Sequence, residues 1–274
     1  MNSLTILIPT RNRELLLIET LTSVRLAFGS GQRVIIGDNG NPTITKRVLS
    51  SFQDLQVVHL ENAKGSSYVQ NLDILVRSCV TEWLSILHDD DIYLAEAGEI
   101  LESIIHTRPE VDFIFSAHPI IDESGEVNEE KTAEYSKSYQ RDDIPEGVTD
   151  QTTYYAARMS IALDGFFVKT ALAQSVYFDT SLLVYDDNRW LLDVCQRSSI
   201  GYYTRRPLFA YRVCQTSLTT ETSTSDTQLK FRIELYKALS RAKITCPKGK
   251  KILRKRKRRI MRSIIAAWVR KIFS

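Results

Sequence analysis

The chain has 274 residues, 43% of them hydrophobic and 25% charged, which is the composition of a globular protein with a sizeable core. Its four cysteines are scattered without a C-x-x-C pair, so the sequence predicts neither a zinc site nor a disulfide framework and is typical of a reducing cytosol. The net charge of +3 conceals an asymmetry: residues 248–274 carry 12 Lys or Arg and no acid, which leaves −9 for the rest of the chain.

Strands and helices alternate through the first third of the chain. Apolar runs and helical periodicity predict strands at residues 4–8, 33–38, 55–60 and 83–87, and helices at residues 14–28, 43–51 and 62–80. In the first helix, Leu15, Ile18, Leu21 and Leu26 are expected to supply much of the apolar face. This order predicts an α/β fold with a mostly parallel sheet, flanked by helices, that binds its ligand at the carboxyl ends of the strands.

The pattern is less regular in the second half of the chain. Further elements are expected as strands at residues 111–115, 160–169, 201–203 and 208–212, a hairpin at residues 119–127 and a helix at residues 227–243. The polar residues 128–148 and 216–226 predict long loops. No run reaches the roughly 20 apolar residues of a membrane-spanning helix. The first residues lead into a strand, so we expect no signal peptide.

Three consecutive acids follow the fourth predicted strand. Asp89, Asp90 and Asp91 come directly after His88. Carboxylates beside a core are costly unless a cation or solvent compensates them, and Mg²⁺ or Mn²⁺ prefers such oxygen ligands together with substrate phosphates. The triplet therefore indicates either a metal–phosphate site or a solvated turn that caps the next helix, and alone it favours neither.

Glycine-rich phosphate loops are absent from the sequence. Neither G-x-G-x-x-G nor G-x-x-x-x-G-K-[ST] occurs, which disfavours dinucleotide oxidoreductases and P-loop phosphotransferases. The absence of G-x-S-x-G likewise disfavours α/β hydrolases. A carboxylate-held metal remains as the means of handling a phosphorylated ligand.

Several segments between residues 4 and 219 resemble, in order, the motifs of the family 2 glycosyltransferases, inverting enzymes with the GT-A fold. The matching segments are P-T-R-N-R (9–13), G-D-N-G (37–40), Asn62 with Gly65, Asn71, L-H-D-D-D (87–91), D-D-N-R-W-L (186–191) and Y-R-V-C-Q-T-S-L-T (211–219). The resemblance implies a GT-A domain over residues 1–245. We divide it into a nucleotide-sugar-binding half (1–115) and an acceptor-binding half (116–245), followed by a basic tail (246–274).

The resemblance also implies roles for individual residues. The donor, a nucleotide-diphosphate sugar and most simply a UDP-sugar, is expected to contact Pro9, Thr10, Arg11, Asn12, Arg13, Asp38, Asn71 and Asp89. A Mn²⁺ or Mg²⁺ ion is expected on Asp90, with Asp89 or Asp91 sharing it. The catalytic base is expected at Asp187 or Asp186.

The sequence departs from the family pattern at several positions. Gly37 stands where an acid is usual, Gln70 replaces an Arg, and Arg11 replaces a base-stacking Tyr, although a guanidinium can also stack on a ring. His88 replaces the first acid of the metal region. Cys214 replaces a His that ligates metal in some members, and a thiol is a poor ligand for Mg²⁺ or Mn²⁺. We therefore expect Cys214 to be a packed residue rather than a ligand.

The chemistry of inverting transfer supports a carboxylate at residue 187 or 186. A divalent ion neutralises the leaving diphosphate, and a base must take the proton of the acceptor hydroxyl from the opposite side of the sugar. A carboxylate on a separate element meets that requirement. The alternative is that the pair only stabilises a helix N-terminus.

Residues 250–273 form a basic amphipathic segment. Cations dominate residues 250–259, and Ile260, Ile264, Trp268 and Ile272 then recur at i, i+4 spacing. The pattern predicts a helix in an anionic membrane interface, on the inner face of the cell membrane and near a lipid-linked acceptor. The alternative is a helix docked on the protein body or on a partner. Nucleic-acid binding fits the cations but not the apolar rows.

The resulting prediction is a cytoplasmic, peripheral glycosyltransferase that acts on a carbohydrate or lipid-linked oligosaccharide in surface polysaccharide biosynthesis. A sugar nucleotidyltransferase is the enzymatic alternative, but it normally has a G-x-G-x-R loop after the first strand, and residues 9–12 are not that. A catalytically degenerate, glycosyltransferase-like binding subunit is the other alternative, motivated by His88 and Cys214.

Overall fold

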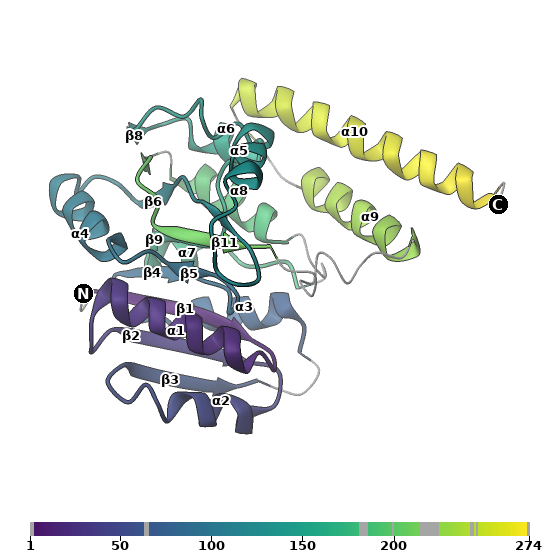
Figure 1. Ribbon diagram of the computed structural model, residues 1–274. Helices are drawn as coiled ribbons and strands as arrows, with labels where there is room; N and C mark the ends of the chain where they lie inside the picture. Colours follow the sequence, from purple (N-terminus) through teal and green to yellow (C-terminus); the bar gives the residue numbers. More distant parts are fainter. Residues whose placement is uncertain are drawn as a thin grey trace.

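The computed structural model describes residues 3–62, 66–180, 186–198, 200–213, 225–241, 244 and 246–272. Its centre is an eight-stranded mixed sheet in the order β3-β2-β1-β4-β9-β6-β10-β8, with helices around it (Figure 1). The strands are β1 (Leu4–Thr10), β2 (Arg33–Asp38), β3 (Gln56–Glu61), β4 (Trp83–Ile86), β6 (Phe113–Ser116), β8 (Gly147–Thr149), β9 (Phe166–Lys169) and β10 (Gly201–Thr204). A smaller three-stranded sheet contains β5 (Ile92–Tyr93), β11 (Phe209–Arg212) and β7 (Ile120–Ile121).

The first half of the large sheet is parallel, as the alternation of strands and helices predicts. β1 pairs in parallel with β2 and with β4, and β2 pairs in parallel with β3. β9 then inserts antiparallel between β4 and β6. The start of β9 therefore lies beside the end of β4, which matters for the site described below.

Two apolar cores lie on opposite faces of this sheet, because successive residues of a strand point to opposite faces. In β1, Ile6 and Ile8 belong to one core and Leu7 to the other. The first core is covered by α1 (Glu14–Phe28), α2 (Pro42–Leu49) and α4 (Ala97–Thr107). The second is covered by α3 (Tyr68–Ser78), α6 (Thr152–Ala157), α7 (Thr170–Gln174) and α8 (Asp186–Arg197).

The predicted bounds of α1 are confirmed, but its predicted apolar face is wrong. Leu15 and Leu26 are 75% and 68% exposed. Of the four predicted residues only Leu21 is fully buried, and it lies with Leu17 and Val24 at the i, i+4, i+7 spacing of one helical face. Leucines at other positions of an amphipathic helix can remain in solvent, because folded proteins expose much apolar surface.

The prediction of one long loop at residues 128–148 is also wrong, since this stretch forms α5 (Glu129–Ser138) and the start of β8. Asn128 caps α5 by accepting a hydrogen bond from the backbone N–H of Lys131 at 2.9 Å. Two glutamates occupy the first turn, where the helix dipole favours negative charge. This polar helix buries no side chain, so the sequence has no apolar periodicity to reveal it.

The basic tail forms one long helix, α10 (Pro247–Ile272), which packs beside α9 (Ser225–Arg241) and extends away from the sheet (Figure 1). Its first half docks on the body. Leu253 is only 7% exposed and joins the second core, and Arg256 Nη1 donates to the Ala157 carbonyl at 2.7 Å. The docked alternative thus holds for this half. Among the described residues, no helix has the length and apolarity required to cross a membrane.

Candidate active site

The carboxyl ends of β1, β2 and β4 meet at one edge of the sheet. Thr10 pairs with Asp38 across β1 and β2, and Leu7 pairs with Ile86 across β1 and β4. The loop after β1 and the segment His88–Asp91 after β4, which we call the acid loop, therefore lie together. This is the edge at which open α/β sheets bind ligands.

Residues 10–13 hold the first two acids of the acid loop. Asp89 accepts hydrogen bonds from Thr10 Oγ1 at 2.7 Å and from the Arg11 N–H at 3.3 Å. Arg13 Nη1 lies 3.1 Å from Asp89 Oδ1 and 2.6 Å from Asp90 Oδ2. Burial raises the pKa of Asp89, and the charge of Arg13 opposes this. A guanidinium thus compensates two carboxylates that the sequence assigns to donor and metal binding.

Asp91, the third acid, is differently placed. It is 1% exposed, and its Oδ1 accepts a hydrogen bond from the Arg212 N–H at 2.7 Å. Its Oδ2 has no hydrogen-bond partner among the described residues. Burial and the nearby charge of Asp164 raise the pKa of Asp91 well above its usual range. A buried, unpartnered carboxylate oxygen next to a second carboxylate is a position that a cation would stabilise.

His88 and Asp164 complete this part of the site. The His88 N–H donates to Asp164 Oδ1 at 2.8 Å, and His88 Nδ1 lies 2.9 Å from Asp164 Oδ2, while its Nε2 contacts the Tyr68 hydroxyl. Burial acts to lower the pKa of His88, but Asp164 raises it, to about 9 overall. Ligand atoms of His88, Asp91 and Asp164 all lie within 4.8 Å of one another, so these residues could hold a metal ion.

Asp164 is the site residue that the sequence analysis missed, and the topology explains why. The alternation of strands and helices predicts ligand residues at the carboxyl ends of parallel strands. Asp164 instead precedes β9, and the antiparallel register of β9 on β4 brings its start to the end of β4. An acid followed by Gly165, directly before the apolar run of residues 166–168, was the available signal.

Asp38 and Asn71 are buried and engaged within the protein. Asp38, 2% exposed, accepts hydrogen bonds from the Gly40 N–H and from Thr45 Oγ1, both at 2.7 Å. Asn71, 1% exposed, donates to the Gly37 carbonyl at 2.7 Å. Pro9 and Thr10 at the end of β1 are buried as well.

Arg11 and Asn12 are the exposed candidates for donor contact. Asn12 adopts a left-handed conformation with φ of 59°, which Asn tolerates better than most residues. Its Oδ1 accepts a hydrogen bond from the Asn41 N–H at 2.7 Å, which ties the loop after β1 to the loop after β2. The Arg11 side chain is therefore presented from a loop that is anchored on both sides.

Asp187 lies in the first turn of α8. Its Oδ1 accepts hydrogen bonds from the backbone and side-chain N–H groups of Asn188 at 2.7 and 3.0 Å. Burial raises the pKa of Asp187, whereas Asn188 and the positive charge of His88 lower it. Asp187 and His88 therefore lie within electrostatic reach of each other. A carboxylate with a raised pKa is a suitable general base near neutral pH.

Some predicted site features lie outside the described residues. They are Gly65, the side chain of Asp186 and the segment 214–219 that contains Cys214. Of that last motif, the structure describes Tyr211 and Arg212. Arg212 is 2% exposed, and besides binding Asp91 it donates from Nε to the Asp90 carbonyl at 2.8 Å. It thus organises the acid loop from β11.

Comparisons with known proteins bear on the family and the fold of the chain. A protein-family model described as glycosyl transferase family 2 matches residues 5–166. Among solved structures, the protein resembles residues 1–349 of S. aureus TarS in complex with UDP-GlcNAc, with a TM-score of 0.68 and 12% identity over 92% of this chain and 70% of that chain. It also resembles the mannosyltransferase PcManGT from Pyrobaculum calidifontis in complex with GDP-Man and Mn²⁺, with a TM-score of 0.67 and 12% identity over 99% and 75% of the two chains. No curated protein matches the sequence. At this identity the structural likeness shows the fold alone, which is the predicted GT-A type of α/β sheet.

Proposed function

Because this chain belongs to glycosyltransferase family 2, with the family model covering more than half of it, we propose that it moves a sugar, with inversion, from a nucleotide-diphosphate donor to a carbohydrate or lipid-linked oligosaccharide acceptor. A UDP-sugar is the donor that we test first. The two structural neighbours hold UDP-GlcNAc and GDP-Man, which supports a donor of this class.

One arrangement supports the proposal: carboxylates on two different elements, the acid loop and α8, both interact with the charge of His88. The acid loop after β4 is held by Arg13 and Arg212, and Asp187 on α8 lies within reach of the charge on His88. Inverting transfer requires a charge-neutralising group for the leaving diphosphate and a base on the acceptor side of the sugar. Asp187 is the base in this proposal, with Asp186 as its neighbour in the same turn.

A Mn²⁺ or Mg²⁺ ion fits the residues present. The unpartnered Oδ2 of Asp91 would be satisfied by a cation, and carboxylate oxygens suit Mn²⁺ and Mg²⁺. The acid loop offers Asp89, Asp90 and Asp91, while the structure adds Asp164, and His88 could join them only after losing its proton. A bound divalent ion would act as a Lewis acid on the leaving diphosphate. Arg13 already lies against Asp89 and Asp90, so these two can join the ion only by loosening that ion pair.

The acceptor proposal draws on the far half of α10. Ile265, Trp268 and Val269 are 53%, 60% and 42% exposed, and Arg258 and Arg262 are exposed close by. An exposed apolar stripe flanked by cations is typical of helices that lie in an anionic membrane interface. We therefore propose a peripheral location on the inner face of the cell membrane, with a lipid-linked acceptor and a role in surface polysaccharide assembly.

Thermal stabilisation by donor candidates tests the transferase assignment. The full chain is heated with UDP-sugars and GDP-sugars, each with and without Mn²⁺, because a ligand that binds the folded state raises the melting temperature. We expect one nucleotide sugar to stabilise the protein, and Mn²⁺ to promote its slow hydrolysis. Stabilisation without any hydrolysis or transfer would favour the catalytically degenerate binding subunit, and no stabilisation by any nucleotide sugar would contradict the proposal.

A further inference from the structure

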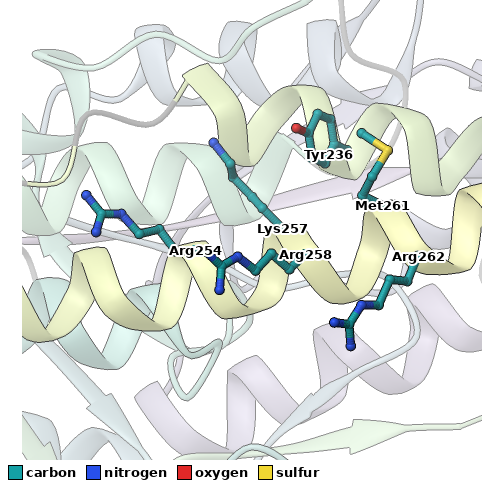
Figure 2. A pocket seen from close by; sticks show the side chains of 6 residues that line it. All are labelled: Tyr236, Arg254, Lys257, Arg258, Met261 and Arg262. Atoms are coloured by element: carbon teal, nitrogen blue, oxygen red, sulfur yellow. The ribbon is translucent and has the colours of Figure 1, made fainter.

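A cationic pocket of about 350 Å³ lies between α9 and α10 (Figure 2). Its lining residues, none of which belongs to the candidate active site, are Tyr236, Arg254, Lys257, Arg258, Met261 and Arg262. Tyr236 comes from α9 and the others come from α10. The volume is within the range of about 300–1,000 Å³ typical of small-molecule sites.

Four of the six residues that line the pocket are cations. None of its four cations forms an ion pair with a carboxylate in the part of the chain that the structure describes, and residues 244–274 contain no acid. Lys257 Nζ lies over the Tyr236 ring, 5.9 Å from its centroid. Like charges three and four residues apart destabilise a helix, so an anion bound among them would relieve repulsion. Arginine forks suit phosphate oxygens in particular.

The same face of α10 changes character along the helix. Arg254, Arg258 and Met261 are followed at helical spacing by Ile265 and Trp268, so that they form one stripe. Its first part is cationic and its last part, the apolar stripe of Ile265, Trp268 and Val269, is exposed. From residue 258 to residue 268 the helix rises by about 15 Å. A ligand that matches this face has an anionic head and an apolar chain.

We propose that the pocket between α9 and α10 binds the phosphate head group of a membrane lipid while the apolar stripe lies in the membrane interface. The inference rests on the membrane association proposed above, and is independent of the transfer chemistry. A specific site of this kind would fix one orientation of α10 at the membrane, which general electrostatic attraction would not.

A pair of matched double variants of the full chain tests the site. Arg254→Gln with Arg258→Gln removes two exposed pocket cations, and Lys255→Gln with Arg259→Gln removes two exposed cations of the same helix that do not line the pocket. Binding is measured by flotation with phosphatidylcholine vesicles made equally anionic by phosphatidic acid or by oleate. On phosphatidic acid, we expect the pocket variant to lose at least about tenfold more affinity than the control variant. On oleate, the two variants should weaken binding equally.

If the two double variants lose the same affinity for phosphatidic acid vesicles, the phosphate site is overturned. The same holds if the original protein binds the two vesicle types equally well. In either case only general electrostatic attachment would remain. No binding of the original protein to either vesicle would overturn both this inference and the membrane association. Both variants should keep the melting temperature and the donor-sugar hydrolysis of the original protein, because all four positions are exposed and lie outside the candidate active site. The hydrolysis assay therefore tests the proposed transfer chemistry, and the vesicle assay tests the proposed lipid site independently of it.

Discussion

Gly37 has no room for a side chain, because an added Cβ would lie 2.1 Å from Asn71 Oδ1. Asn71 is held in that place by its hydrogen bond to the Gly37 carbonyl and by one from Asn62 Nδ2 at 2.6 Å. The absence of the family's usual acid at this position thus has a local steric reason. We expect Gly37→Ala to lower the free energy of unfolding by about 1–3 kcal/mol, as overpacking does, in urea titrations monitored by circular dichroism.

The same substitution in an Asn71→Ala background provides the control. With the amide removed, the nearest remaining side chain is that of Leu75, whose Cγ would lie 3.0 Å from the added methyl group, so the cost of Gly37→Ala should shrink but not vanish. If the cost is the same in both backgrounds, contact with Asn71 is not the reason for glycine at residue 37.

His118 is a buried titratable residue outside the candidate active site. It is 8% exposed, its ring lies 4.4 Å from that of Phe209, and Tyr211 is also near. Burial and the charge of Arg141 lower the pKa of His118 well below 6.5. A hydrogen bond with the Ser116 backbone acts in the opposite direction but is the smaller effect. The folded protein therefore keeps this residue neutral under conditions in which the unfolded chain protonates it.

Stability should accordingly depend on pH through His118. The free energy of unfolding is not affected by this residue above about pH 6.5. As the pH falls below that value toward the lowered pKa, the unfolded chain binds a proton at His118 and the folded protein does not. The free energy of unfolding then falls by up to about 1.4 kcal/mol per pH unit. His118→Phe should flatten the decline in unfolding free energy between about pH 6.5 and pH 5. Parallel curves for the two proteins would contradict the assignment.

At the residue scale, the sequence predicted that the candidate residues which follow parallel strands lie together. The acid loop, Asp38 and the 9–13 segment meet at one edge because the order of β1, β2 and β4 brings them there. Asp164 could not be predicted in the same way, since the insertion of the antiparallel β9 depends on contacts between distant segments rather than on local pattern. Likewise, the compensation of Asp89 and Asp90 by Arg13 is a matter of side-chain geometry that spacing does not encode.

At the scale of elements, buried strands were predicted well and amphipathic helices less so. β2 and α1 have the predicted bounds, because continuous apolar runs and clear end signals are local properties. The apolar face of α1 and the existence of α5 depended on the neighbours that each helix has in the fold. The tail shows the same limit: its cations and apolar rows predicted a helix, but the packing of its first half on α6 and α9 is tertiary information.

Two truncations separate the roles of the two halves of α10. Removal of everything after Thr245 takes away Leu253, which is buried in the second core, and the Arg256 contact with Ala157. We expect a loss of about 2–5 kcal/mol in unfolding free energy, the usual cost of emptying a buried leucine site. Removal of residues 264–274 leaves those contacts in place and deletes the exposed apolar stripe together with Arg270 and Lys271, so it should leave stability nearly unchanged.

Both truncations should reduce binding to anionic vesicles, measured by flotation. Only the shorter deletion therefore gives an interpretable test of membrane association, since the longer one also damages the body. Full vesicle binding after the deletion of residues 264–274 would show that the apolar stripe does not mediate attachment.

At the scale of the whole molecule, one sheet joins the two predicted halves of the domain. The boundary predicted at residue 115 falls inside β6, and β9 from the second half lies between β4 and β6 from the first. The donor-binding candidates, from residue 9 to residue 89, nevertheless precede this point, whereas Asp187 on α8 follows it. In the proposed function, donor binding and acceptor activation therefore belong to different parts of a continuous sheet.

This division predicts that Asp187→Asn separates donor binding from transfer. The amide cannot accept the acceptor proton, so the transfer rate should fall at least about hundredfold, within the usual contribution of a general base. The donor-induced rise in melting temperature should persist, because the donor-binding candidates lie on other elements. Asp193→Asn is the matched control on the same helix: its carboxylate pairs with Arg189 Nε at 3.0 Å, and its replacement should leave transfer nearly intact. Full transfer activity in Asp187→Asn would remove Asp187 from the mechanism, and loss of donor stabilisation would place it in donor binding instead.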